Sequence, residues 1–125
     1  MLFRPIPDAE VVFRAVPEVM DYSVGDVFEH KGFMSTSRVA SRAMTFGPRK
    51  DSKETTIGTL FEIRLPKGYN GIRTNANEAE LILPHKSKFK VLSVQENVEG
   101  TVKFSSTVKE NTTIKRVIVL EPVDE

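Results

Sequence analysis

A short stretch in the second half of the chain, residues 75–84, alternates between acidic and apolar side chains. Successive side chains of a β-strand point to opposite faces, so this pattern predicts a strand with Glu78 and Glu80 on one face and Leu81 and Leu83 on the other. The apolar face can be buried in a core, while the two carboxylates lie about 7 Å apart along the strand. Like charges on one face suggest that the strand holds something cationic; the alternative is an ordinary solvated strand face.

The composition is that of an ordinary globular domain. Hydrophobic residues make up 39% and charged residues 28% of 125 residues, enough for one domain over residues 1–125 and too few for two. The net charge of +1 creates no global field that would attract nucleic acid, which is therefore not an expected partner. Cysteine is absent and the two histidines, His30 and His85, are isolated, so no disulfide, thiol nucleophile or metal site is expected.

The first residues do not have the pattern of a signal peptide, and no apolar run approaches the length of a membrane span. We therefore expect a soluble chain with no membrane partner. A strand pattern already starts at Val11, so the chain could be the C-terminal part of a longer protein.

The sequence as a whole predicts mostly β-structure. Strands are expected at residues 11–16, 31–37, 57–65, 78–84, 87–94, 101–108 and 112–120, with a turn at 109–111. Two helical segments are expected, a single turn at 17–21 and a short helix at 38–45 that Ser37 caps. The predicted fold class is α+β, mostly β, with few short helices and an antiparallel core that is sandwich-like or strongly bent.

An arginine, Arg14, lies in the middle of the first long strand, where a charged side chain needs a partner. It is followed by Ser35-Thr36-Ser37 at a strand end and by Glu78-Ala79-Glu80 after a glycine-bearing loop. In this order and spacing, the motifs resemble mono-ADP-ribosyltransferases of the arginine, Ser-Thr-Ser, Glu-x-Glu class, which includes the binary-toxin enzymes, the clostridial exoenzymes and phage relatives. The resemblance covers residues 11–94 and implies two antiparallel sheets forming a cleft for NAD, the substrate, without a metal.

The resemblance assigns residues to the NAD site. Arg14 would reach the phosphates and the nicotinamide ribose, and the backbone of Ala15 would hold the carboxamide. Phe46 stands where the family has a phenylalanine beside the nicotinamide, and Arg49 where it has a second phosphate-binding arginine. The other residues expected to contact NAD are Ser35, Thr36 and Glu80. Taken alone, Arg14 could equally be a structural ion-pair partner, Phe46 a core residue and Arg49 a solvated loop charge.

The catalytic roles implied by the resemblance agree with the chemistry. The bond that breaks joins a ribose carbon to a pyridinium nitrogen, so nicotinamide leaves as a neutral molecule and no general acid is needed. A negative group near the developing oxocarbenium ion is needed instead, as in glycoside hydrolysis. Glu80 would supply this charge, Ser35 would orient it by a hydrogen bond, and Thr36 and Ser37 would hold the sheets in register.

The acceptor is expected to be an arginine of a target protein, because a second carboxylate, Glu78, could bind a guanidinium and help to remove its proton. Tyr69 lies in the loop with which the family recognises its target. The implied partner is a host protein, and the implied setting is that of a secreted or injected effector or a virion component. The alternatives are an NAD glycohydrolase and a non-catalytic module that binds NAD or protein.

The sequence departs from the family pattern at its start. The family's helical segment before the arginine strand has no counterpart in the ten residues before Val11.

Overall fold

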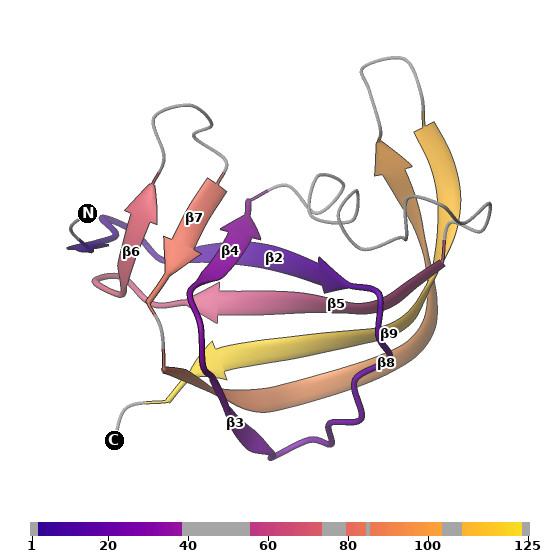
Figure 1. The fold of residues 1–125 in the computed structure, drawn as a ribbon, viewed down its shortest axis with the longest axis horizontal. Helices are drawn as coiled ribbons and strands as arrows, with labels where there is room; N and C mark the ends of the chain where they lie inside the picture. Colours follow the sequence, from indigo (N-terminus) through magenta and orange to yellow (C-terminus); the bar gives the residue numbers. More distant parts are fainter. Residues whose placement is uncertain (1–2, 39–55, 74–79, 85, 104–108, 124–125) are drawn as a thin grey trace.

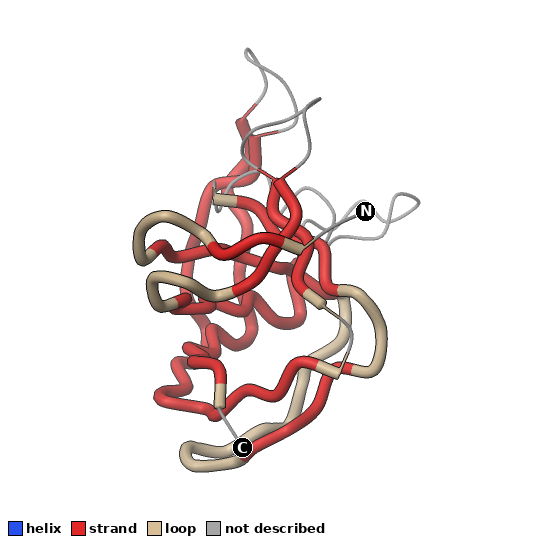
Figure 2. The backbone as a smooth tube through the Cα atoms, turned by 90° about the vertical axis from the view of Figure 1, so that its left-hand side faces the viewer, coloured by secondary structure: helices blue, strands red, loops and turns tan. Residues whose placement is uncertain are grey.

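The computed structural model describes residues 3–38, 56–73, 80–84, 86–103 and 109–123. Within these ranges the chain forms strands and loops without a helix, as Figure 2 shows. The nine strands are β1 Arg4–Pro5, β2 Glu10–Val16, β3 Val27–His30, β4 Met34–Ser37, β5 Thr56–Leu65, β6 Asn70–Arg73, β7 Glu80–Leu83, β8 Ser87–Lys103 and β9 Lys109–Pro122. The expected predominance of β-structure is therefore confirmed, and the helix expected at 38–45 falls almost wholly outside the described residues.

The described strands form one sheet, in the order β1-β6-β7-β4-β2-β5-β9-β8-β3, so the expected division into two sheets around a cleft is not confirmed. Neighbouring strands are antiparallel except β5 and β9, which run parallel. Figure 1 shows that β4, β6 and β7 run steeply across the direction of β2, β5, β8 and β9. We call β1, β6, β7 and β4 the short limb and the remaining five strands the long limb. Only one pair of residues, Phe13 and Ser37, joins β4 to β2 in the described ladder.

The main core follows from the predicted alternation. Phe61, Ile63 and Leu65 of β5 are buried, whereas Glu62 and Arg64 between them are not. The apolar face of β5 packs against the apolar faces of other strands. The core contains Ile6, Val12, Met34, Phe61, Ile63, Leu65, Leu81, Leu83, Phe89, Val91, Ile118 and Leu120, drawn from both limbs. Burial of this shared core holds the short limb against the long one.

The helical turn expected at residues 17–21 is wrong: this segment crosses the sheet without regular structure. Its backbone groups are bound by side chains of the strands below. The hydroxyl of Thr59, which is fully buried, donates to the carbonyl of Glu18 at 2.9 Å and accepts from the amide of Met20 at 2.8 Å. Arg116 Nη1 donates to the carbonyl of Met20 at 2.7 Å. Backbone groups engaged in this way cannot form the i to i−4 hydrogen bonds of a helix.

The C-terminal part forms one long hairpin in place of the three shorter strands expected. Strands β8 and β9 pair from Phe89 and Pro122 as far as Lys103 and Lys109. The turn expected at 109–111 is therefore wrong, because these residues belong to β9 and pair with residues 101–103 of β8. Figure 1 shows the end of β8 and the start of β9 on the same side of the molecule as the end of β6 and the start of β7.

Candidate active site

The fold brings together one residue from each of the three sequence motifs. Arg14 of β2 donates a hydrogen bond from Nη1 to the carbonyl oxygen of Ser35 on β4, at 3.2 Å. The hydroxyl of Ser35 donates to Oε2 of Glu80 on β7, at 3.3 Å. These contacts span 21 and 45 residues of sequence, so a continuous polar path runs from the arginine through the serine to the carboxylate.

The register of β4 and β7 decides which side chains share a face. Ser35 lies opposite Ile82, and Ser37 opposite Glu80, so the serines and the carboxylate are on the same side of this strand pair. Thr36 points the other way: it is buried, and its hydroxyl donates to the carbonyl of Leu81 at 2.6 Å. This arrangement confirms the expected strand faces for Glu80 and Leu81. It also shows that Thr36 fastens β4 to β7.

Arg14 differs from the ion-paired arginines of the structure. Among the described residues, four arginines lie within 4 Å of a carboxylate: Arg38, Arg64, Arg73 and Arg116. In the described part of the chain Arg14 has no such partner and binds a neutral carbonyl instead. Partial burial lowers the pKa of Arg14, because desolvation disfavours its charged form, yet an arginine side chain stays protonated at neutral pH. A half-buried cation without a carboxylate partner fits an anionic ligand such as a phosphate.

The other residues expected to bind NAD are only partly described. Ala15 is buried in β2 and pairs with Leu60 of β5. Its side chain lies in a second, smaller core cluster with Ile57, Leu60 and Ile114. Phe46, Arg49 and Glu78 lie outside the described residues, so their assignments stay predictions.

Tyr69 has contacts within the fold. Its ring is partly buried against the main core, and its hydroxyl donates to Ser87 Oγ at 3.1 Å. Its carbonyl accepts a hydrogen bond from the amide of Ile6, and its amide donates to Pro66. These contacts give Tyr69 a part in joining β1, β6 and β8. The expected role in target recognition stays a prediction.

Sequence reasoning missed Glu10, whose carboxylate accepts hydrogen bonds from two arginines, Arg38 at 3.3 Å and Arg73 at 2.6 Å. The signal was present, because Glu10 and Arg14 are four residues apart and so share one face of β2. What the sequence alone does not show is that the two arginines, 28 and 63 residues further on, meet at this point.

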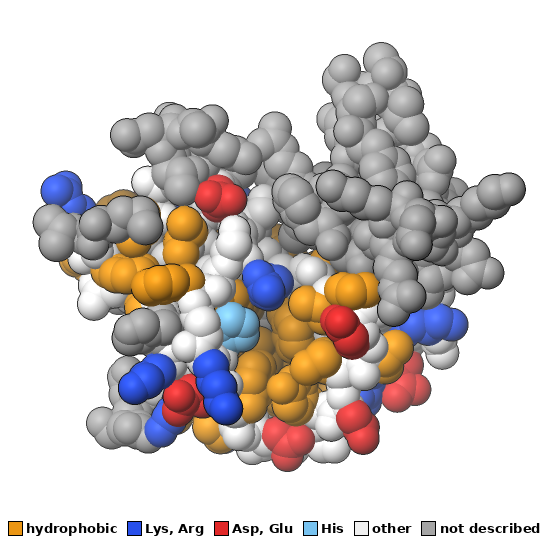
Figure 3. Space-filling view, in the orientation of Figure 1, with side chains coloured by type: hydrophobic (Ala, Val, Ile, Leu, Met, Phe, Trp, Pro, Cys, Tyr) orange, Lys and Arg blue, Asp and Glu red, His pale blue; other side chains and the backbone are white. Residues whose placement is uncertain are grey.

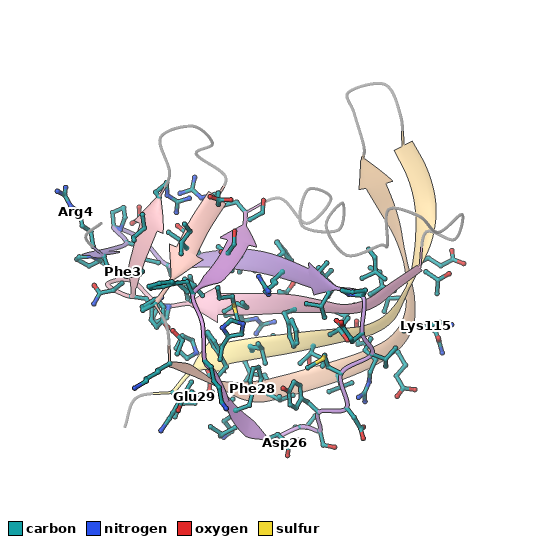
Figure 4. The ribbon with its side chains drawn as sticks, viewed as in Figure 1. Phe3, Arg4, Asp26, Phe28, Glu29 and Lys115 are labelled. Atoms are coloured by element: carbon teal, nitrogen blue, oxygen red, sulfur yellow. The ribbon has the colours of Figure 1, made fainter. Side chains whose placement is uncertain are left out.

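Partly buried hydrophobic side chains line the adjoining face of the long limb. Tyr22 and Phe28 stack with ring centroids 4.4 Å apart and pack against the core. Figure 4 shows Phe28 on the inner side of β3, with Asp26 at the outer edge. Hydrophobic side chains gather in the middle of the surface seen in Figure 3, with basic and acidic side chains around them. The described residues contain no helix with the length and hydropathy that a membrane crossing requires.

A bent, mostly antiparallel sheet with an arginine, a serine and a glutamate joined across three strands defines the class of ADP-ribosyltransferase-like proteins. Residues 9–121 match the family model described as ADP-ribosyltransferase exoenzyme, and the chain belongs to this family. No curated protein matches the chain.

Several solved structures share the fold. The enzymatic component C2-I of the C2 toxin from Clostridium botulinum aligns with a TM-score of 0.62 and 20% identity over 96% of this chain. Plx2a, an ADP-ribosyltransferase toxin from Paenibacillus larvae, aligns with a TM-score of 0.61 and 13% identity over 96%. The catalytic domain of VahC from Aeromonas hydrophila has a TM-score of 0.55 and 26% identity over 94%. The chain spans 32% of the length of C2-I, 64% of Plx2a and 61% of the VahC domain.

Proposed function

We propose that this chain carries the catalytic residues of an NAD-dependent mono-ADP-ribosyltransferase that transfers ADP-ribose to an arginine of a target protein and releases nicotinamide. The observation that carries the proposal is the polar path from Arg14 through Ser35 to Glu80. Membership of the exoenzyme family supports the same reaction class.

Glu80 is the proposed catalytic residue. When the bond between the ribose carbon and the nicotinamide nitrogen breaks, its electron pair goes to nicotinamide, which leaves neutral, and positive charge develops on the ribose. A carboxylate fixed beside this charge lowers the barrier, because it does not have to reorganise during the reaction. The hydrogen bond from Ser35 limits the orientations of the Glu80 carboxylate.

Arg14 is proposed to bind the pyrophosphate of NAD. Its guanidinium is partly desolvated and, among the residues described, lacks a carboxylate partner, which favours an anionic ligand. We assign Arg49 as the second phosphate ligand, Phe46 as the residue beside the nicotinamide ring and the Ala15 backbone as the partner of the carboxamide. The remaining NAD contact is assigned to Ser35, whereas the side chain of Thr36 is buried on the other face of β4 and binds the carbonyl of Leu81.

Glu78 is proposed to bind the acceptor guanidinium. It stands two residues before Glu80, so in an extended chain both carboxylates share a face. The acceptor nitrogen forms a bond to the ribose carbon and loses a proton, which a carboxylate can accept. Tyr69 is proposed to contribute to target recognition through the preceding loop, and the target is proposed to be a host protein met by a secreted or injected effector.

The test uses agmatine, a small guanidinium acceptor, with NAD and the chain as it exists. Wild-type protein is expected to form ADP-ribosylagmatine and nicotinamide. Glu78→Gln is expected to abolish transfer to agmatine and to retain hydrolysis of NAD, because water needs no guanidinium ligand. Nicotinamide release without agmatine modification would identify a glycohydrolase, and NAD binding without turnover in the folded protein would identify a binding module. Either result would overturn the proposal.

A further inference from the structure

Glu10 forms a charged cluster apart from the three motif residues. Its Oε1 lies 2.6 Å from Nη2 of Arg73, and its Oε2 lies 3.3 Å from Nη2 of Arg38. The Glu10 side chain is only 14% exposed, compared with 27% for Arg73 and 48% for Arg38. A carboxylate buried to this degree is stabilised only when it is paired, so both contacts matter for the local structure.

Two of the three residues lie at the ends of strands, and the third directly follows a strand. Glu10 is the first residue of β2, Arg73 is the last of β6, and Arg38 directly follows β4. The cluster thus links the long limb to two strands of the short limb. Arg73 also lies opposite Leu81 in the register of β6 and β7, next to Glu80. A displacement of Arg73 would therefore shift the start of β7.

Backbone pairing holds β4 to β7 over four residues but joins β4 only weakly to the long limb. The described ladder between β2 and β4 consists of one pair, Phe13 and Ser37, whereas β2 and β5 pair over seven consecutive residues. Side chains from one face of β2 supply the missing constraint. Arg14 binds the carbonyl of Ser35, and Glu10, four residues earlier on the same face, binds Arg38 beyond the end of β4. The two contacts hold β4 at both ends.

We propose that Glu10 is a positioning residue that, through Arg38 and Arg73, fixes the short limb so that the Ser35 hydroxyl and the Glu80 carboxylate stay in contact. It acts through these two arginines and does not itself touch the reacting atoms. The proposal rests on the proposed function only for its effect on turnover. Its structural part, the dependence of the Ser35–Glu80 contact on Glu10, can be tested whether or not the protein turns over NAD.

The first test compares Glu10→Gln with Glu62→Gln. Glu62 is a matched control, because it forms a 3.7 Å ion pair with Arg64 on β5 and its ladder partners, Phe13 and Val119, both lie on the long limb. Glu10→Gln is expected to lower the kcat of NAD hydrolysis about 10- to 100-fold, as small misplacements of catalytic groups do, with a smaller change in NAD affinity. Glu62→Gln is expected to retain wild-type kcat. Equal kcat values for Glu10→Gln and wild type would overturn the proposal.

The second test needs no turnover. The carboxyl ¹³C chemical shift of Glu80 reports the hydrogen bond that Ser35 donates to it. This shift is expected to move in Glu10→Gln, to move less in Arg38→Met, which leaves the Arg73 contact in place, and to stay constant in Glu62→Gln. An unchanged Glu80 signal in both folded cluster variants would overturn the proposal. An inactive wild type would count against the proposed function alone, because the signal of Glu80 would still decide the role of Glu10.

Discussion

The hydroxyl of Ser35 donates a hydrogen bond to Oε2 of Glu80 at 3.3 Å, joining two motifs that are 45 residues apart in the sequence. Both side chains lie on the same side of the β4–β7 pair, while Thr36 fastens the pair from the other side. The strand register therefore positions the serine and the carboxylate together. The contact gives the serine motif a physical role, since it limits the orientations of a carboxylate that is not fully buried.

Ser35→Ala is expected to reduce kcat for nicotinamide release about tenfold, because one hydrogen bond to a charged group contributes about 1.5–3 kcal/mol and this one is partly solvated. The dissociation constant of NAD, measured by calorimetry, should change less than kcat. Ser93→Ala on β8 is the control, because β8 lies between β9 and β3 in the sheet and does not neighbour the strands that carry the three motifs. An unaltered kcat in Ser35→Ala would show that the contact does not serve catalysis.

Arg14→Ala is expected to weaken NAD binding by about 1.5–3 kcal/mol, the range for a charged hydrogen bond. Arg49→Ala should act in the same direction with a smaller effect, since Arg14 is held rigidly in a strand. Arg64→Ala is the matched control: its side chain is 60% exposed and pairs with Glu62 at 3.7 Å. Calorimetric affinities that stay equal in Arg14→Ala and Arg64→Ala would rule out Arg14 as a phosphate ligand.

Gly58→Ala is expected to destabilise the fold by more than about 2 kcal/mol, through overpacking of backbone. A Cβ at this position would lie 2.2 Å from the carbonyl oxygen of Pro17, where the crossing segment passes over β5. Gly32→Ala is the control, because the nearest atom to its Cβ, on the His30 ring, is 4.0 Å away. Thermal unfolding should show a large fall in Tm for the first variant and little change for the second. Similar Tm values would contradict the close approach.

Tyr69→Phe is expected to lower the free energy of unfolding by about 1 kcal/mol, because it removes the hydrogen bond to Ser87 and retains the packed ring. Tyr69→Ala should cost more, since the ring packs against the core. Denaturant unfolding measures both. If Tyr69 also recognises the target, Tyr69→Ala lowers protein modification while NAD hydrolysis by the folded protein is retained. Parallel loss of both activities would argue for a structural role alone.

The strands that carry Arg14, Ser35 and Glu80 could be predicted from the sequence, because alternation and β-branched residues are local signals. The ladder confirms the predicted faces of Glu80 and Leu81. Which strands neighbour one another is not a local property. The parallel pairing of β5 with β9, and the continuation of one sheet through the Phe13–Ser37 pair, depend on contacts distant in the sequence.

The errors and omissions have the same origin. Residues 109–111 are polar and resemble a turn, but pairing with β8 keeps them in a strand. Residues 17–21 were expected to form a helical turn, but the buried hydroxyl of Thr59 binds their backbone. Glu10 was missed because its two arginine partners are far along the chain. In each case a tertiary contact overrides or adds to the local pattern.

The central claim is that the carboxylate of Glu80 stabilises positive charge on the ribose when nicotinamide leaves. The measurement that tests it most directly is the rate of nicotinamide release from NAD by wild type, Glu80→Gln and the control Glu29→Gln, an exposed residue on β3. Glu80→Gln keeps the shape and removes the charge, so release is expected to fall about 10²- to 10⁴-fold with little change in NAD affinity. Glu29→Gln is expected to match the wild-type rate. Release by Glu80→Gln at the wild-type rate would contradict the claim.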